Sequence, residues 1–314
     1  MKYVRIIKNW EDPNILRQTP KSLGIWDDVR FTLDPIEEYD YVLVLNYPKE
    51  SVKVRSYPKN VWCLVQEPPN EFFKYALSFD KNYHRIFTQD TSLHGEKFIL
   101  SQPATPWLID RDYDALKKMK MPSKTRNVSF ITSKKMSFQG HRDRMRFLEK
   151  IKGRVHFDLY GFGFKEIADK WEGLAPYRYT LVVENYSGPY YWSEKLSDAY
   201  LAFTMPIYFG CTNITDFFPK ESFVSIDIND KDCIEKLNKI IKSDIWKKNL
   251  KYVANARNLI LEKYQFFPYM TTKIHQWENR NISKEKRTIS LQKGYNLQNQ
   301  LIGKLKRGIK TFVP

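Results

Sequence analysis

The chain contains 314 residues, carries a formal net charge of +16 at pH 7 and has 42% hydrophobic residues. This apolar content can build sizeable cores, which excludes a wholly disordered chain, and the length exceeds that of one typical domain. The 12 glycines and 16 prolines exclude a collagen-like chain, and three cysteines without a CxxC pair or a Cys/His cluster argue against a disulfide framework or structural zinc.

The first part of the chain alternates short apolar runs with polar connections. Two runs, Tyr41–Leu45 and Val61–Val65, are almost continuously apolar, as expected for parallel strands buried on both faces. Further candidate strands are Tyr3–Ile7, Ala76–Phe79 and Arg85–Thr88. Spacings of about 20 residues predict an α/β sheet with helical or irregular crossovers.

The polar, basic stretch 110–126 contains a central proline and is the best candidate for a linker. After it the alternation restarts, with predicted strands at Asn127–Thr132, Val155–Tyr160, Tyr179–Val183, Met205–Phe209 and Phe223–Ile226 and predicted helices at 140–152, 193–203, 234–241 and 246–261. We therefore expect an α/β protein with domains at 1–120 and 121–275 and a basic amphipathic tail at 276–314.

Half of the excess charge lies near the end of the chain. Residues 279–314 carry nine Lys/Arg and one Glu, a net charge of +8. A solvated terminus and docking on an anionic membrane surface both fit this segment. The opening residues do not resemble a signal peptide, and no run approaches the roughly 20 apolar residues of a membrane span. We expect a cytoplasmic protein, with peripheral binding at the inner face of the membrane as the alternative.

The segment Tyr179–Tyr200 contains the densest signal for a functional site. It consists of a buried strand, a polar loop and a helix that begins near Ser193, for which Ser193 is a suitable N-cap and Glu194 a suitable first-turn acid. Lys195 opposes the helix macrodipole there, and a bound anion would resolve this conflict. An ordinary strand-loop-helix with a solvated lysine is the alternative.

This segment, together with Thr204–Gly210 and Pro219–Val224, resembles the donor-binding region of the α1,3/4-fucosyltransferases, glycosyltransferase family ten. In that family a strand ends in Phe-Glu-Asn, a loop reaches Tyr, and a helix opens with Thr-Glu-Lys. The corresponding residues stand at the same spacings in this chain: Glu184, Asn185, Tyr191, Glu194 and Lys195. Val183 departs from the usual Phe, and Trp192-Ser193 from the usual Val-Thr.

A second match lies upstream. Arg144–Ile151, followed by Phe157–Gly161, resembles the arginine-containing helix before a Val-Tyr-Gly strand end in the family. The resemblance makes Arg144 the phosphate-binding arginine, with Arg142 and Arg146 as rivals. A guanidinium suits a diphosphate because it stays charged and bonds bidentately. Gly161 would let the backbone approach the nucleotide. A basic surface helix is the alternative.

The third match is Gln66–Asn70, directly after the buried strand Val61–Val65. A carboxylate at the carboxyl end of a parallel strand lies where α/β sheets build their sites. In the resemblance, Glu67 corresponds to the glutamate that acts as the catalytic base. A solvated loop glutamate is the alternative, and Glu71 is the rival carboxylate.

The resemblance implies a GT-B-like architecture, in which two Rossmann-type α/β domains face each other across a cleft. The first domain would bind the acceptor and carry Glu67, and the second would bind GDP-β-L-fucose. The implied reaction moves L-fucose, with inversion, to a glycan hydroxyl, as an α1,3 or α1,4 linkage to GlcNAc or Glc of a surface oligosaccharide. Arg144 and Lys195 would neutralise the diphosphate, and the remaining donor-binding residues would be Glu184, Asn185, Tyr191, Glu194 and Gly161.

No metal is expected to be required, although stimulation by a divalent ion stays open. Asp110, Asp112 and Asp114 match the carboxylate spacing of metal-dependent sugar transferases, but they fit a helix start in a polar segment better. The two competing functions are another inverting transferase with a different nucleotide sugar and a basic nucleic-acid-binding protein. The second gives Glu67 and the Glu194-Lys195 pair no role, so we expect no nucleic-acid partner.

Overall fold

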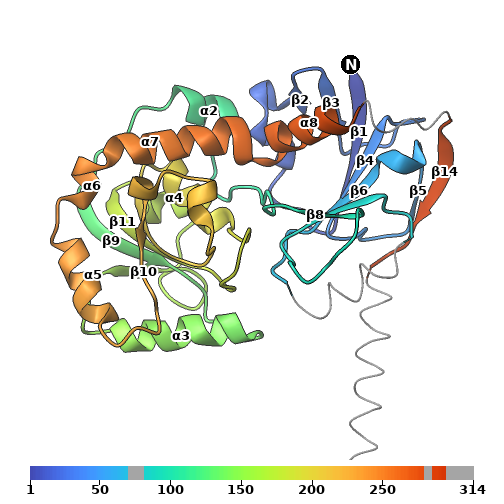
Figure 1. Cartoon of the computed structure of the whole chain (residues 1–314). Helices are drawn as coiled ribbons and strands as arrows, with labels where there is room; N and C mark the ends of the chain where they lie inside the picture. The colour runs from blue at the N-terminus through green and yellow to red at the C-terminus, as the bar shows by residue number, and fades with distance from the viewer. Residues whose placement is uncertain (70–80, 279–284, 295–314) are drawn as a thin grey trace, which may run out of the picture. The chain divides into compact units, whose positions relative to one another are not determined.

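The computed structural model describes residues 1–69, 81–278 and 285–294 (Figure 1). The chain divides into two compact units. The first comprises Met1–Leu16, Leu23–Pro103 and the residues from Met270 onward, and the second comprises Arg17–Ser22 and Ala104–Tyr269. Each unit is built around its own sheet of mainly parallel strands. The predicted α/β fold with two such units is therefore confirmed.

The first unit contains a seven-stranded sheet in the order β2-β3-β1-β4-β6-β7-β8. Its neighbouring strands are parallel except for the β2–β3 pair. Every residue of β4 and β6 is buried, which agrees with their continuously apolar sequences. The strand bounds are β1 Lys2–Lys8, β2 Ile25–Trp26, β3 Val29–Thr32, β4 Tyr41–Leu45, β6 Val61–Leu64, β7 Arg85–Thr88 and β8 Phe98–Leu100.

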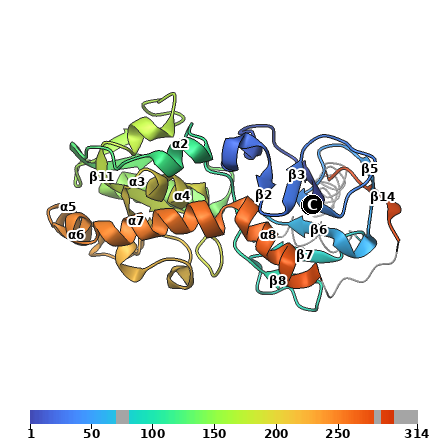
Figure 2. The ribbon, with the colours of Figure 1, turned by 90° about the horizontal axis from the view of Figure 1, so that it is seen from above.

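Two segments from the C-terminal part of the chain complete the first unit. Strand β14 (Arg287–Leu291) pairs antiparallel with β5 (Val52–Ser56), and the side chain of Leu291 is fully buried. Helix α8 (Phe266–Trp277) lies over β6 and β7 (Figure 2), where the ring centroid of Trp277 is 5.8 Å from that of Trp62 and 5.7 Å from that of Phe87. Part of the segment predicted as a tail from residue 276 is therefore sheet and core, because its apolar side chains are buried there.

The second unit contains a five-stranded parallel sheet in the order β10-β9-β11-β12-β13. Helix α4 packs against β11 and β12 and against α7. The strand and helix bounds are β9 Arg126–Ile131, β10 Asp158–Tyr160, β11 Tyr177–Val183, β12 Met205–Phe209, β13 Val224–Ser225, α3 Gln139–Ile151, α4 Glu194–Leu201, α5 Cys233–Ile241, α6 Ile245–Lys248 and α7 Leu250–Leu259. A π-helical turn follows at Ile260–Tyr264, and short 3-10 helices lie at Ile15–Gln18, Pro20–Ser22, Pro58–Asn60, Lys170–Gly173, Ile214–Asp216 and Lys220–Ser222.

The segment predicted as a linker is an integral part of the second unit. Helix α2 (Tyr113–Lys118) begins after Asp112, whose carboxylate accepts a hydrogen bond from the Ala115 N–H at 2.7 Å. The Tyr113 hydroxyl donates to Glu262 at 3.0 Å, and Leu116 is fully buried. The unit therefore starts at Ala104 rather than at residue 121, because apolar side chains of this segment enter its core.

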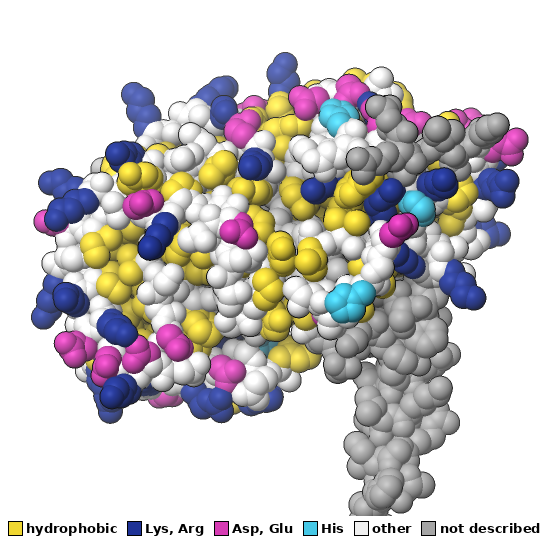
Figure 3. Space-filling view, viewed as in Figure 1, with side chains coloured by type: hydrophobic (Ala, Val, Ile, Leu, Met, Phe, Trp, Pro, Cys, Tyr) yellow, Lys and Arg dark blue, Asp and Glu magenta, His cyan; other side chains and the backbone are white. Residues whose placement is uncertain are grey.

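Figure 3 shows one face of the molecule, on which charged and apolar side chains alternate over the described parts. None of the described helices is both long enough and apolar enough to cross a membrane. The predicted strand Ala76–Phe79 and the tail beyond residue 294 lie outside the described residues.

Candidate functional site

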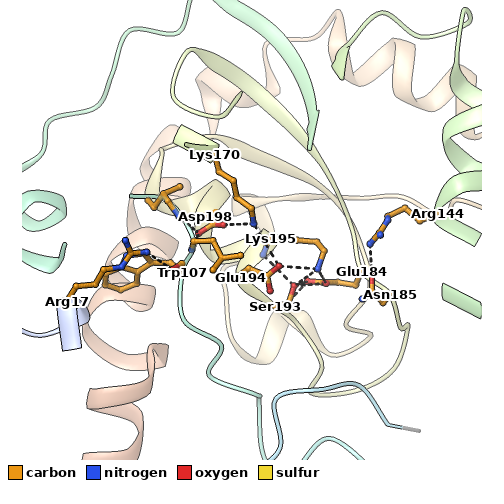
Figure 4. Close-up of polar contacts among 12 residues, drawn as sticks. Arg17, Trp107, Arg144, Lys170, Glu184, Asn185, Ser193, Glu194, Lys195 and Asp198 are labelled. Carbon is orange, nitrogen blue, oxygen red and sulfur yellow. Dashed lines mark hydrogen bonds and ion pairs between the residues drawn. The ribbon is translucent and has the colours of Figure 1, made fainter. Parts of the chain in front are cut away.

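Buried charged groups meet in the second unit where β11 ends and α4 begins (Figure 4). Glu184 directly follows β11, and its side chain is fully buried. Its carboxylate accepts hydrogen bonds from the backbone N–H of Ser193 at 2.8 Å and from the Ser193 hydroxyl at 2.7 Å. Lys195 Nζ lies 3.3 Å from the same carboxylate. The buried acid therefore fixes both the start of α4 and the ammonium group in its first turn.

The ammonium group of Lys195 also contacts Ser193 Oγ at 3.0 Å and Glu194 Oε1 at 3.4 Å. Burial alone would lower the pKa of Lys195, but Glu184 and Glu194 offset burial and raise that pKa above its ordinary value. The conflict between Lys195 and the helix macrodipole is therefore resolved by two carboxylates of the chain itself. The prediction that Lys195 also faces a bound anion stays a prediction.

A second ion pair continues the network along α4. Lys170 Nζ lies 3.0 Å from Asp198 and 3.9 Å from Glu194. Burial would raise the pKa of Glu194, but Lys195 and Lys170 lower it to about 2. Burial raises the pKa of Asp198, whose carboxylate also accepts the Leu108 N–H at 2.8 Å. Sequence reasoning missed this pair because Lys170 lies outside the matching segments and Asp198, although it lies within Tyr179–Tyr200, gains its partner only in the folded chain.

Arg144 points from α3 toward the loop after β11. Only 4% of Arg144 is exposed, and its guanidinium donates to the Asn185 side-chain oxygen at 2.5 Å. Its buried Nε has no hydrogen-bond partner among the described residues. Burial lowers the pKa of Arg144, while the nearby acids, first Glu184 and then Glu194, act in the opposite direction. The guanidinium therefore keeps a donor available for a further acceptor.

The two rival arginines of the same helix lie elsewhere. Arg142 donates to Gln139 at 2.8 Å on the exposed part of α3. Arg146 pairs with Asp143 and leaves 71% of its side chain exposed. Among the three arginines, Arg144 alone is brought against Asn185, so the geometry favours it as the candidate phosphate ligand.

Three glycines permit close backbone approaches around this site. A Cβ atom at Gly140 would lie 1.6 Å from the Asn185 carbonyl oxygen, and one at Gly210 would lie 2.5 Å from Cγ of Glu184. Gly161 has φ +114°, and its Cβ would lie 2.0 Å from the Thr132 carbonyl oxygen. The contact with Thr132 is thus sufficient reason for glycine at 161, and its expected role toward a nucleotide stays a prediction. Sequence reasoning missed Gly140 and Gly210, although Gly210 closes one of the matching segments.

The loop between β11 and α4 is held by aromatic packing. Tyr191 and Trp192 are buried, with 3% and 1% exposure. The Tyr191 ring centroid lies 5.9 Å from that of Tyr186 in an edge-on arrangement. Trp192, the unexpected residue in this motif, packs with its ring centroid 5.2 Å from that of Phe218. The tryptophan therefore anchors the loop in the core of the second unit.

Glu67 belongs to the first unit, where it follows β6. The backbone leading to it is fixed, because the Val65 N–H donates to the Phe87 carbonyl at 2.9 Å and the Gln66 N–H donates to the Asn46 side chain at 2.7 Å. Glu67 itself is exposed. It therefore stands at the carboxyl end of a buried parallel strand, as expected, and its role as a base stays a prediction. Glu71 lies outside the described residues.

Within the described ranges, no group of three or more His, Cys, Asp or Glu side chains is arranged to hold a metal ion. Asp112 is engaged as the N-cap of α2, and Asp110 lies 3.2 Å from Arg17. The prediction that no metal is required is not tested by this observation.

The chain is similar to the α-(1,3)-fucosyltransferase FucT of Helicobacter pylori, with 28% identity over 188 residues. The match covers 51% of this chain and 39% of that protein, so the chain spans about two fifths of the length of this relative. A crystal structure of an α1,3-fucosyltransferase aligns with a TM-score of 0.48 and 18% identity over 85% of this chain and 93% of that one. A crystal structure of an α1,3-fucosyltransferase with GDP-fucose gives a TM-score of 0.47 and 18% identity, over 85% and 92% of the respective chains.

Residues 121–255 match the family model described as the C-terminal part of glycosyltransferase family 10, the fucosyltransferases. The match runs from just before β9 into α7 and includes the whole Arg144–Asn185 and Glu184–Lys195 constellation. The resemblance of this chain to glycosyltransferase family 10 therefore rests on residues 121–255, which make up less than half of its length.

Proposed function

We propose that the chain is an inverting fucosyltransferase that moves L-fucose from GDP-β-L-fucose to a hydroxyl of a glycan acceptor. One observation carries the proposal: the residues that match the family model contain a buried arginine and a partly buried lysine near one strand end of the second unit. The similarity to a protein named α-(1,3)-fucosyltransferase supports the choice of sugar. An α1,3 linkage to GlcNAc or Glc of a surface oligosaccharide is our finer proposal, with α1,4 as its alternative.

In this proposal Arg144 and Lys195 bind the diphosphate of the donor. The raised pKa of Lys195 keeps its ammonium charged at neutral pH, and Arg144 has a buried Nε that can donate. Preorganised cations of this kind stabilise the charge that develops on a departing phosphate, because they need no reorganisation during the reaction. Asn185, Tyr191 and Glu194 are proposed to contact the remaining donor groups. Glu184 acts through Lys195 and Ser193 rather than on the donor itself.

The proposed base is Glu67. As the acceptor oxygen forms its bond to the anomeric carbon, its proton passes to the Glu67 carboxylate. The bond from that carbon to the phosphate oxygen breaks, and GDP leaves with the electron pair. A general base must reach the proton that it removes, and Glu67 is exposed at the carboxyl end of β6, where α/β sheets build their sites.

Partners and location follow from the same proposal. We propose a GDP-sugar donor, an oligosaccharide acceptor and no obligatory metal ion. Lys286 and Lys293 pair with acids of the chain itself, and the other seven Lys/Arg residues after residue 278 support peripheral binding to an anionic membrane, which would place the enzyme at the inner membrane face.

The test is a hydrolysis and transfer screen across GDP-, UDP- and CMP-sugars, with and without a chelator. We expect turnover of GDP-fucose alone, in the presence of chelator. Lys195→Ala should lower the rate more than a hundredfold, since one charged transition-state contact is worth roughly 10²–10³ in rate. Lys247→Ala, which removes an exposed lysine of α6, is the matched control and should leave the rate unchanged.

Glu67→Gln should abolish transfer to an acceptor while leaving GDP affinity within about twofold of the wild type. Equal turnover of UDP- or CMP-sugars would instead indicate an inverting transferase that uses a different nucleotide sugar. An unaffected Lys195→Ala enzyme would refute the assigned diphosphate site.

A further inference from the structure

A basic groove lies in the first unit, and its lining includes none of the residues assigned so far. It has a volume of about 560 Å³, which is within the usual range for small-molecule sites. Its walls come from the segments that precede β6, β7 and β8 and from β14. The charged lining residues are Lys59, Lys81, His84, Arg85, Glu96 and Lys97.

The charges of the groove are strongly unbalanced. Four Lys/Arg side chains face a single carboxylate, Glu96, among the described lining residues. The same cations affect His84: its pKa is lowered first by burial and then by Arg85, Lys59 and Lys97. Lining of this kind repels cations and attracts a concentrated negative charge.

The groove is built on ordered backbone. Arg85 is stacked against two indoles, with its guanidinium carbon 4.8 Å from the Trp277 ring centroid and 5.6 Å from that of Trp62. The Asn82 side chain donates to the Ser290 carbonyl of β14 at 3.0 Å. These contacts fix the arginine and the segment before β7, so that part of the positive charge is held in place before any ligand arrives.

The groove is separate from the proposed chemistry. Its residues precede β6, β7 and β8, which are parallel strands, and therefore lie at the amino ends of the sheet. Glu67 follows β6 and lies at the opposite, carboxyl edge. On the face of the first unit seen in Figure 3, Lys and Arg side chains lie beside histidines.

We propose that this groove binds a phosphate-bearing group, as a second anion site distinct from the donor site. Two sources share this chemistry: a soluble phosphorylated compound and the headgroup of an anionic phospholipid. Four cations in one groove suit a multiply charged phosphate better than a single carboxylate, because each adds a contact to the same charge. The proposal concerns the first unit only and does not depend on fucosyl transfer.

His84 provides a local reporter for the test. An anion seated among Lys59, Arg85 and Lys97 would oppose their effect and raise the pKa of the His84 imidazole. Lys81 and Glu96 also line the groove. Both are the same in the wild-type protein with and without the anion, so a change in the His84 pKa between these two states reports the anion. Because His84 lines the groove, its titration reports directly on an anion bound there.

The experiment compares the full-length protein with Lys59→Glu/Lys81→Glu/Lys97→Glu and with the corresponding Gln triple variant. The matched control is Lys231→Glu/Lys239→Glu/Lys247→Glu, which reverses three exposed lysines of the second unit and changes the net charge equally. The probes are pyrophosphate, followed by NMR titration of His84, and vesicles of neutral phosphatidylcholine with or without phosphatidylglycerol, followed by co-sedimentation.

We expect at least one probe to bind the groove variants at least tenfold more weakly than the wild type and the control. A raised His84 pKa with pyrophosphate, without groove-dependent vesicle binding, identifies a soluble phosphate ligand. Groove-dependent binding to phosphatidylglycerol vesicles identifies a lipid headgroup. If neither probe distinguishes the groove variants from the control variant, the proposed site does not exist.

Discussion

Lys195 depends on its neighbours for both its position and its charge. Its ammonium group lies between a fully buried carboxylate, Glu184, and the first-turn acid Glu194. A buried ion pair of this kind adds little net stability, because desolvation offsets the attraction, whereas removal of one partner is costly. The pair therefore fits the proposed role of Lys195 as a charged diphosphate ligand better than a role in folding.

Glu184→Gln should lower the pKa of Lys195, because the largest source of stabilisation for its charge is removed. The alkaline limb of the rate profile should then shift to lower pH, with a rate loss that grows as pH rises. The measurement is donor hydrolysis as a function of pH. Glu235→Gln, an exposed acid in the first turn of α5, should leave the profile unchanged. An identical alkaline limb in Glu184→Gln would contradict the assignment of Glu184 as a positioning residue.

Gly210→Ala tests the same arrangement through sterics. The added Cβ would lie 2.5 Å from Cγ of Glu184, so the glutamate must move and Lys195 must lose its support. We expect donor hydrolysis to fall by roughly tenfold to a hundredfold. Gly153→Ala is the control, because Gly153 has φ +71° but open space around its Cβ. That variant should lose about 1 kcal/mol of stability and keep its activity.

Helix α4 is buried from Leu196 to Leu201 and has a polar partner at each end. Ser193 caps its N-terminus, and Lys124 donates to the Ala202 carbonyl at 2.7 Å and to the Thr204 hydroxyl at 2.9 Å near its C-terminus. Burial lowers the pKa of Lys124 to about 7. The lysines at the two ends of α4 thus differ. Lys195, in its first turn, is held charged, whereas Lys124, which contacts its C-terminal end from outside the helix, has a pKa near neutrality.

This contrast predicts a pH-dependent stability. The folded-state pKa of Lys124, about 7, lies below its ordinary value of 10.5, so the unfolded chain binds more protons between these values. The free energy of unfolding should therefore gain a contribution as pH rises from about 7 toward 10.5. Denaturant unfolding at several pH values should show this slope reduced in Lys124→Met and retained in Lys118→Met, an exposed lysine of α2. Equal slopes in all three proteins would contradict the prediction.

The sequence predicts best those strands whose side chains are nearly all buried, because such strands are continuously apolar. β4, β6 and β11 are uniformly apolar and almost wholly buried, and Glu184-Asn185 and Glu194-Lys195 lie in ordered motifs at their ends. The Lys170–Asp198 pair depends on contacts between distant segments, which no local pattern reveals. The counter-charge for Lys195 was missed for a related reason, because a glutamate eleven residues away becomes a neighbour only after the loop folds back.

At the scale of the whole molecule, the chain passes between its two units four times, at residues 16/17, 22/23, 103/104 and 269/270. The last passage returns the chain to the first unit, where β14 pairs with β5 over more than two hundred residues of separation. This strand lies in a basic stretch with mostly exposed side chains, so composition favoured a tail. The burial of Leu291 in one apolar cluster with Val44 and Val54 shows that β14 is part of the core of the first unit.

Truncation tests this interpretation. A chain ending at Gly294 retains β14, whereas a chain ending at Glu278 lacks it and should melt at a lower temperature. Leu291→Ala should lie between them, with a cost of about 2–5 kcal/mol and a decrease in Tm of roughly 5–15 °C. Thermal unfolding followed by circular dichroism measures all three. Equal melting temperatures for the two truncated chains would show that β14 contributes no stability.

The late position of β14 also has a consequence for synthesis. A ribosome makes the chain from its N-terminus, so the other described strands of the first unit emerge before β14. Until residues 287–291 are released, β5 presents an unpaired edge, and such an edge can pair with another chain. The nascent protein therefore depends on residues 287–291 to close this edge of β5 against self-association.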